Sequence, residues 1–300
     1  MANANTDKYP ALFAPDITAK LKCLRDRYKD QETHRFGYET VLNAEDNSCD
    51  IAFRIDTGKE PVGNIYLEFD HEVYESAAEG GELTPCVFLD ATCLKPKHNA
   101  EEISAFFDVD LTGLVGADKA KRFKEPLLAL AEKLHGKCTS LFQVGSMDSR
   151  MPSDSLRVYT ERMTAKSARA LLDELSWPGD RELAGSILSE MKAYAFGGSF
   201  IISFDLFADH TISEKTRIEF HVPQTEPEQL DDFLACLTER GHCVPGNADA
   251  LREWVKERPV YSTNFKNDIA HFKYTIESGR VKTVKAYLRQ SDDLRICPAW

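Results

Sequence analysis

The stretch VKTVKAYLRQ, residues 281–290, decides the fold that this sequence predicts. Within 284–289 apolar and polar residues alternate strictly, which is the period of a β-strand with one face against a core. The other face carries an ammonium, a phenol and a guanidinium in a row, those of Lys285, Tyr287 and Arg289. Three such groups side by side call for an explanation from the rest of the chain.

Alternating segments of this kind come in pairs, and helical patterns separate the pairs. The paired segments are residues 49–56 and 62–69, 139–147 and 154–161, 199–207 and 215–223, and 268–278 and 281–290. Apolar residues at helical spacing predict helices around 123–134, 171–175, 183–191, 230–237 and 251–255, with further helices between Asp16 and Val41. Because no single strand is followed by a crossover helix, a Rossmann-type parallel sheet is excluded. The order predicts an α+β fold in which an antiparallel sheet has helices on one face.

The face of the sheet turned away from the helices is polar. Its residues are Asp50, Ala52, Arg54 and Asp56; Asn64, Tyr66 and Glu68; Arg157 and Tyr159; Arg217, Glu219 and His221; His271, Lys273 and Thr275; and Lys285, Tyr287 and Arg289. A sheet of about eight strands with helices on one side tends to close into a barrel, so this set would line a lumen. The alternative is an open sheet with a solvated polar face. We expect a closed antiparallel β-barrel of repeated ααββ units, formed by residues 1–300 as a single domain.

The composition restricts the classes of partner that the protein is expected to bind. The net charge of −12 argues against non-specific binding of nucleic acid or of an anionic membrane. The N-terminal residues contain no basic region followed by an apolar run, and no stretch approaches the roughly 20 apolar residues of a membrane span. We therefore expect a cytoplasmic monomer that is not inserted in a membrane.

Four strings resemble one enzyme family. HFKYTIESGRVKTVKAYL (271–288) is similar to the closing hairpin of the cyanobactin-type peptide prenyltransferases, which have the ααββ (ABBA) barrel fold. FQVGSMDSRMPSDSLRVY (142–159) resembles the middle hairpin, FDLFADHTISEKTRIEFHV (204–222) the third, and CDIAFRID (49–56) the opening strand. These short motifs are spread over about the whole chain.

The resemblance implies a reaction and explains the cationic strand. Such enzymes transfer a dimethylallyl or geranyl group from its diphosphate, the co-substrate, to a side chain of a peptide. Cations stabilise the departing diphosphate, while aromatic faces stabilise the allylic cation and shield it from water. The diphosphate set that the resemblance implies is Arg54, Asn64, Arg157, Arg217, His271, Lys273 and Lys285. The prenyl shield is Ala52, Tyr66, Tyr159 and Tyr287, and the catalytic acids are Asp50 and Glu219.

The sequence departs from the family pattern at one position and lacks a metal motif. The family usually has an Arg where this chain has Asn64, and Arg54 on the neighbouring strand could replace it. An aspartate-rich DDxxD motif is absent; the nearest string, DDFLA at 231–235, fits a solvated helix face. We expect Mg²⁺ to be able to assist diphosphate departure, without an obligatory site on the protein.

The acceptor and the function class both have alternatives. Asp50 is the expected base for the nucleophile, and the excess of inward acids favours a basic acceptor, arginine before histidine. Acids that only pair with neighbouring cations would explain the same residues. A small-molecule prenyltransferase shares the fold, and a barrel that binds a ligand without chemistry is a further alternative.

We also expect the inward cations to be replaceable without loss of folding.

Overall fold

The computed structural model describes residues 9–13, 35–44, 49–55, 65–69, 86–95, 100–136, 139–146, 154–224, 227–256 and 266–291. At 35, 36, 49–55, 65–69, 227, 266, 290 and 291 the description is limited to the backbone. That residues 1–300 form a single domain stays a prediction.

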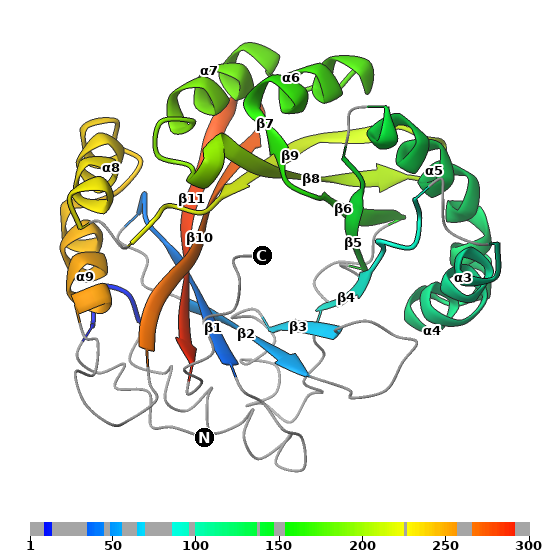
Figure 1. Cartoon of the computed structure of the whole chain (residues 1–300), viewed down its shortest axis with the longest axis horizontal. Coiled ribbons are helices and arrows are strands. Elements are labelled where there is room, and N and C mark those ends of the chain that lie inside the picture. The colour runs from blue at the N-terminus through cyan, green and yellow to red at the C-terminus, as the bar shows by residue number, and fades with distance from the viewer. Residues whose placement is uncertain are drawn as a thin grey trace.

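The strands of these parts belong to one antiparallel arrangement. They are β1 (Arg35–Val41), β2 (Cys49–Ile55), β3 (Ile65–Phe69), β4 (Cys86–Asp90), β5 (Leu141–Ser146), β6 (Ser155–Thr160), β7 (Met163–Thr164), β8 (Ser199–Phe207), β9 (Ile212–Phe220), β10 (Lys266–Glu277) and β11 (Arg280–Ser291). Their spatial order is β6-β5-β4-β3-β2-β1-β11-β10-β9-β8-β7, and β6 also pairs with β8. The pairing therefore runs round a curve that surrounds a central region (Figure 1).

Helices lie outside this curve (Figure 1). They are α3 (Ala100–Ala105), the π-helix η2 (Phe106–Leu111), α4 (Thr112–Val115), α5 (Ala117–His135), α6 (Ala165–Glu174), α7 (Arg181–Met191), the 3₁₀ helix η3 (Phe196–Gly198), α8 (Pro227–Glu239) and α9 (Pro245–Lys256). Two have side-chain N-caps: Thr164 accepts from the Ser167 amide before α6, and Asp180 accepts from the Leu183 amide before α7. The predicted α+β class, with an antiparallel sheet and external helices, is confirmed.

The apolar core lies between the sheet and the helices. The strand residues predicted to face the helices are almost completely buried there, as Ile218, Phe220, Phe272 and Tyr274 show. The opposite face is also buried: Glu219 and other polar residues of that set have little exposure. An open sheet with a solvated polar face is therefore wrong for the described strands, and the polar residues line the inside of the curve.

Two details of the predicted architecture are wrong. Residues Arg35–Val41, expected within a helical segment, form β1, and β4 was not predicted. The wall is also uneven. At about 3.3 Å per residue, the 5-residue β3 and β4 extend about 17 Å and the 12-residue β10 and β11 about 40 Å. Among the described residues β3 and β4 pair over three positions, and because β6 pairs with β8 each strand from β1 to β6 and from β8 to β11 has a neighbour on both sides. The unpredicted strands β1 and β4 interrupt the expected order of regular ααββ units.

The strand β10 contains an irregularity that matters for the site. Its pairing with β11 shifts between Ile269 and His271, and Ala270 has no partner in that ladder. A β-bulge of this kind moves the residues on its two sides into a new alternation. As a result Asp268 and His271, three positions apart, both lie on the inner face with their partners Arg289 and Tyr287.

Candidate active site

Cross-strand pairing brings the predicted residues into rows on the inner face. One row runs Asp50, Glu39, Tyr287 and His271 across β2, β1, β11 and β10. In β2 and β3 the register sets Ala52 opposite Gly37 and Glu68, and Arg54 opposite Tyr66. Of Asp50, Ala52, Arg54 and Tyr66 the backbone position is described; Asn64 and Asp56 lie outside the described residues.

Lys273 is the centre of the site. Its ammonium lies 3.0 Å from Glu219 Oε1, an ion pair, and donates a hydrogen bond of 2.5 Å to the Tyr287 hydroxyl. The same nitrogen lies 4.4 Å from the ring centroid of Tyr287 and 5.9 Å from that of Tyr159. A cation between two aromatic rings and a carboxylate is thus held in a largely desolvated position, since Lys273 is 8% exposed and Glu219 is 6% exposed.

Glu39 of β1 binds the second lysine. Its carboxylate forms a short ion pair with Lys285 on β11, and Glu39 is buried. In the register Glu39 stands between Asp50 and Tyr287. Two acids are therefore neighbours on adjacent strands, and one of them neutralises a cation that the sequence assigned to the diphosphate.

A second cationic group surrounds Asp205 on β8. Arg157 Nε lies 2.9 Å from Asp205 Oδ1, and Arg217 Nη2 lies 3.4 Å from Oδ2. Burial alone would raise the pKa of Asp205, but the charges of Arg217 and Arg157 outweigh it and hold the pKa below its usual range. Burial, followed by the charge of Arg157, lowers the pKa of Arg217.

His271 lies on the inner face of β10, opposite Tyr287. Its ring stacks on Tyr287 with centroids 4.0 Å apart and an interplanar angle of 19°. Burial lowers its pKa to about 4, although 31% of its side chain is accessible. The imidazole is therefore neutral near pH 7, and the place of His271 in the predicted diphosphate set stays a prediction.

Apolar side chains adjoin the cations. Tyr159 packs with Cys86 and Phe88 in a small cluster separate from the main core, and Phe142 and Ile201 pack against it. The rings of Phe88 and Tyr159 meet edge to face at 5.6 Å. Tyr159 therefore belongs to both environments: it borders the Lys273 ammonium on one side and the apolar cluster on the other.

One rim of the sheet carries a further ion pair. Arg289 binds Asp268 through two hydrogen bonds, of 2.8 and 2.6 Å. Nearby, His221 Nδ1 lies 2.9 Å from the carbonyl oxygen of Ala270, and burial lowers the pKa of His221. Each carboxylate described on the inner face of these strands thus has a basic partner or, for Asp90, a hydroxyl and an amide of Thr92.

The described residues do not fit a protein-held metal. Among them no group of three or more His, Cys, Asp or Glu is placed to hold an ion. Glu39, Asp205, Glu219 and Asp268 are each bound by Lys or Arg. No helix in the described parts of the chain is long and apolar enough to cross a bilayer.

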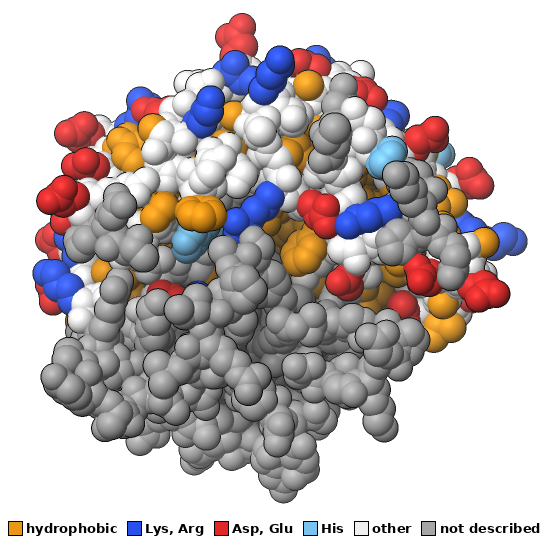
Figure 2. Space-filling view, in the orientation of Figure 1, with side chains coloured by type: hydrophobic (Ala, Val, Ile, Leu, Met, Phe, Trp, Pro, Cys, Tyr) orange, Lys and Arg blue, Asp and Glu red, His pale blue; other side chains and the backbone are white. Residues whose placement is uncertain are grey.

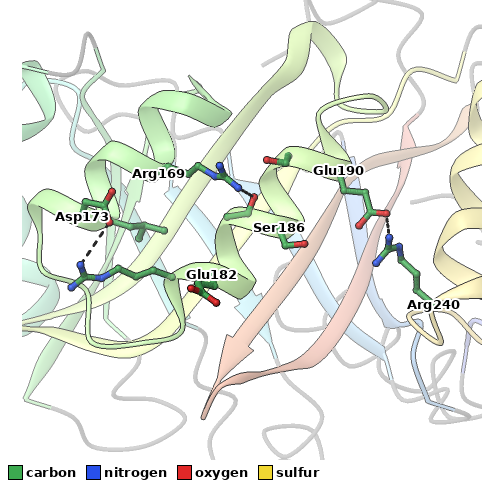
Figure 3. A pocket seen from close by; sticks show the side chains of 10 residues that line it. Arg169, Asp173, Glu182, Ser186, Glu190 and Arg240 are labelled. Carbon is green, nitrogen blue, oxygen red and sulfur yellow. Dashed lines mark hydrogen bonds and ion pairs between the residues drawn. The ribbon is translucent and has the colours of Figure 1, made fainter.

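A hollow of about 850 Å³ lies elsewhere, on the helix layer (Figure 3). Its charged groups are occupied in joining helices: Arg169 donates to the Gly185 carbonyl, and Arg240 pairs with Glu190. A Cβ on Gly185 would collide with the Arg169 guanidinium, so a larger residue there would displace that side chain. Acids and bases are interspersed in this hollow, as they are over the described surface in Figure 2.

Sequence reasoning missed three groups of this site. Glu39 was expected in a helical segment, although the aromatic and β-branched residues of RFGYETV are typical of a strand. Asp205 lies on a strand that was predicted, and its alternation with Phe204 and Leu206 would have placed it inward. The apolar cluster at β4 gave no signal, because CVFLD is short and mostly apolar.

Comparison with known proteins adds little to this picture. No protein-family model matches the chain. No curated protein matches it in sequence. Among solved structures it is similar to the apo form of the prenyltransferase PriB: the identity is 12%, the match covers 86% of this chain and 79% of that one, and the TM-score is 0.45. A likeness of this strength carries no conclusion about fold or activity.

Proposed function

We propose that this chain is a prenyltransferase that moves a dimethylallyl or geranyl group from its diphosphate to a side chain of a ribosomal peptide. The observation that carries the proposal is the place where Lys273, Tyr287 and Tyr159 meet the apolar cluster around Phe88. A ligand with a multiply charged head and an apolar tail would satisfy both halves. Prenyl diphosphates have this construction.

The reaction needs charge stabilisation at two points. When the allylic C–O bond breaks, its electron pair stays with the diphosphate, whose charge Arg157, Arg217, Lys273 and Lys285 would stabilise. The carbon fragment becomes an allylic cation, which the faces of Tyr159 and Tyr287 would stabilise and screen from water.

The acceptor then attacks the allylic carbon and loses a proton. Asp50 is the proposed base, with Glu219 as the second candidate. Support for Asp50 comes from the register, which sets it beside Glu39 and in the row of Tyr287 and His271. Glu219 is held by Lys273, which favours a positioning role for it in the resting protein.

Arginine is the acceptor residue that we propose first. A guanidinium binds carboxylates through paired N–H donors, and Asp50 and Glu39 occupy neighbouring register positions. Against this, the described inner acids already have basic partners, so a neutral phenol or indole is the competing acceptor. A small aromatic metabolite in place of a peptide would use the same donor site.

The test is a panel of short peptides that each contain one Arg, His, Tyr, Trp or Ser, incubated with dimethylallyl or geranyl diphosphate. The expected result is a mass gain of one prenyl group on the arginine peptide, located by fragment ions. Gain on Tyr or Trp alone would refute the arginine acceptor. Donor binding without transfer to any peptide or small aromatic would refute the enzyme and favour a ligand-binding barrel.

Variants connect the activity to this site. Lys273→Ala should lower the turnover by about a hundredfold or more, the size of effect seen when a donor to a developing anion is removed. The matched control is Lys256→Ala, since Lys256 also pairs with a glutamate, Glu253, but on an exposed helix surface. Equal activity of the two variants would show that transfer occurs elsewhere.

A further inference from the structure

The carboxylate of Asp205 is shared by two buried arginines. Arg157 donates from Nε at 2.9 Å, and Arg217 approaches both carboxylate oxygens, at 3.5 and 3.4 Å. The side chains of Arg157 and Arg217 are 12% and 5% exposed, and that of Asp205 is 17% exposed. One negative charge therefore lies between two positive charges in a place that water hardly reaches.

The surroundings of this group add positive charge. Lys215, also on β9, is close enough for the charges of Arg217 and Arg157 to lower its pKa, after the larger effect of burial. Lys215 Nζ forms an ion pair of 3.6 Å with Glu277 Oε1, and Glu277 also binds Lys282. Lys215 therefore adds a further cation beside Arg217 and Arg157, and an anion with more than one charge could contact several of these cations at once.

A buried hydroxyl completes the group. Ser203 precedes Asp205 by two residues on β8 and is the cross-strand neighbour of Arg217 and Tyr159. Its side chain is fully buried, and its Oγ has no hydrogen-bond partner among the described residues. An unsatisfied hydroxyl in such a position is costly unless a ligand or water binds it, and an anion oxygen could accept its proton in a hydrogen bond.

We propose that Asp205 is a resident counter-ion: its carboxylate occupies the anion position between Arg157 and Arg217 until a diphosphate group displaces it. Asp205 would thereby determine specificity. A monoanion gains too little from the two guanidinium groups to displace a tethered carboxylate, whereas a diphosphate brings several charges and can also reach Lys215 and Ser203. The identity of the anion, a prenyl diphosphate, rests on the proposed function. The displacement of the Asp205 carboxylate by an anion does not.

The test measures binding of inorganic pyrophosphate and inorganic phosphate by titration calorimetry at constant ionic strength. Wild-type protein should bind pyrophosphate and bind phosphate far more weakly. Asp205→Asn should bind pyrophosphate about tenfold more tightly or better, because a competing charge is gone, and should gain measurable phosphate binding. The matched control is Asp268→Asn, which removes an arginine-bound carboxylate at the other rim and should leave both affinities unchanged.

Thermal unfolding gives a second measurement. If Asp205→Asn is less stable, pyrophosphate should raise its Tm by more than it raises the wild-type Tm. Should that variant not fold alone, Asp205→Ser expressed and purified with pyrophosphate present is expected to fold and bind it. Unchanged or weaker pyrophosphate binding by the variants, or loss of folding that pyrophosphate does not rescue, would overturn the counter-ion role.

The outcomes separate this inference from the proposed function. Tighter pyrophosphate binding by Asp205→Asn without prenyl transfer by wild-type protein would support the counter-ion role of Asp205 and refute the prenyltransferase function. Prenyl transfer by wild-type protein with no change of pyrophosphate binding in Asp205→Asn would support the prenyltransferase function and refute the counter-ion role.

Discussion

Replacing Lys273 by Met should destabilise the protein strongly. The substitution keeps an unbranched chain of similar length but removes the ammonium that lies 3.0 Å from Glu219 Oε1. At an effective dielectric constant near 20, two charges at that distance attract by about 5 kcal/mol. Because Glu219 is almost completely buried, the variant would leave a carboxylate without its counter-charge, and such losses typically amount to about 3–5 kcal/mol. We therefore expect the free energy of unfolding to fall by about that amount.

A double-mutant cycle isolates this interaction. Glu219→Gln should also destabilise, whereas Lys273→Met with Glu219→Gln together should lose much less than the sum, since neither charge is then left alone. Urea unfolding of the four proteins, followed by tryptophan fluorescence, gives the coupling energy. The control is Lys256→Met, whose exposed pair with Glu253 should contribute about 0.5 kcal/mol or less. Additive losses at Lys273 and Glu219 would refute the reasoning.

Three further predictions concern neighbouring positions. The pKa of His271 is lowered to about 4, so the unfolded chain binds more protons than the folded one below about pH 6.5. The free energy of unfolding should therefore decrease by up to about 3 kcal/mol as the pH falls from 6.5 to 4. Urea titrations of His271→Gln should lack that part of the pH dependence. Gly145→Ala would drive a Cβ into the ring of Phe88, so it should lower Tm and reduce use of geranyl more than of dimethylallyl diphosphate; an unchanged rate ratio would exclude this cluster from the prenyl site. Asp50→Asn should abolish transfer and spare diphosphate binding, and full activity would show that another acid, such as Glu219, is the base.

The local pattern of the sequence predicts much of the fold. Alternation in 268–278 and 281–290 gave both strands of β10 and β11 and the inward placement of Lys273, Lys285 and Tyr287, because the period of a strand is fixed by backbone geometry. Helical spacing likewise gave α5 to α9. These elements depend on residues close together in the chain, which a single sequence displays directly.

The partners of the inward cations could not be predicted in this way. Arg157 and Asp205 are 48 residues apart, and Lys285 and Glu39 are 246 apart. Such pairs depend on strand order and register, which arise from long-range packing. The change of alternation before His271 is equally invisible: strict alternation would have put Asp268 on the helix side, away from Arg289.

The bulge at Ala270 also has a consequence for proton location. Its carbonyl, outside the ladder with β11, lies 2.9 Å from His221 Nδ1. A carbonyl oxygen can only accept, so the nitrogen facing it must carry the hydrogen. Since burial keeps His221 neutral near pH 7, its Nε2 is then left with a lone pair and can only accept. An alanine, which has no titratable group, thereby selects the tautomer of a histidine that directly follows β9.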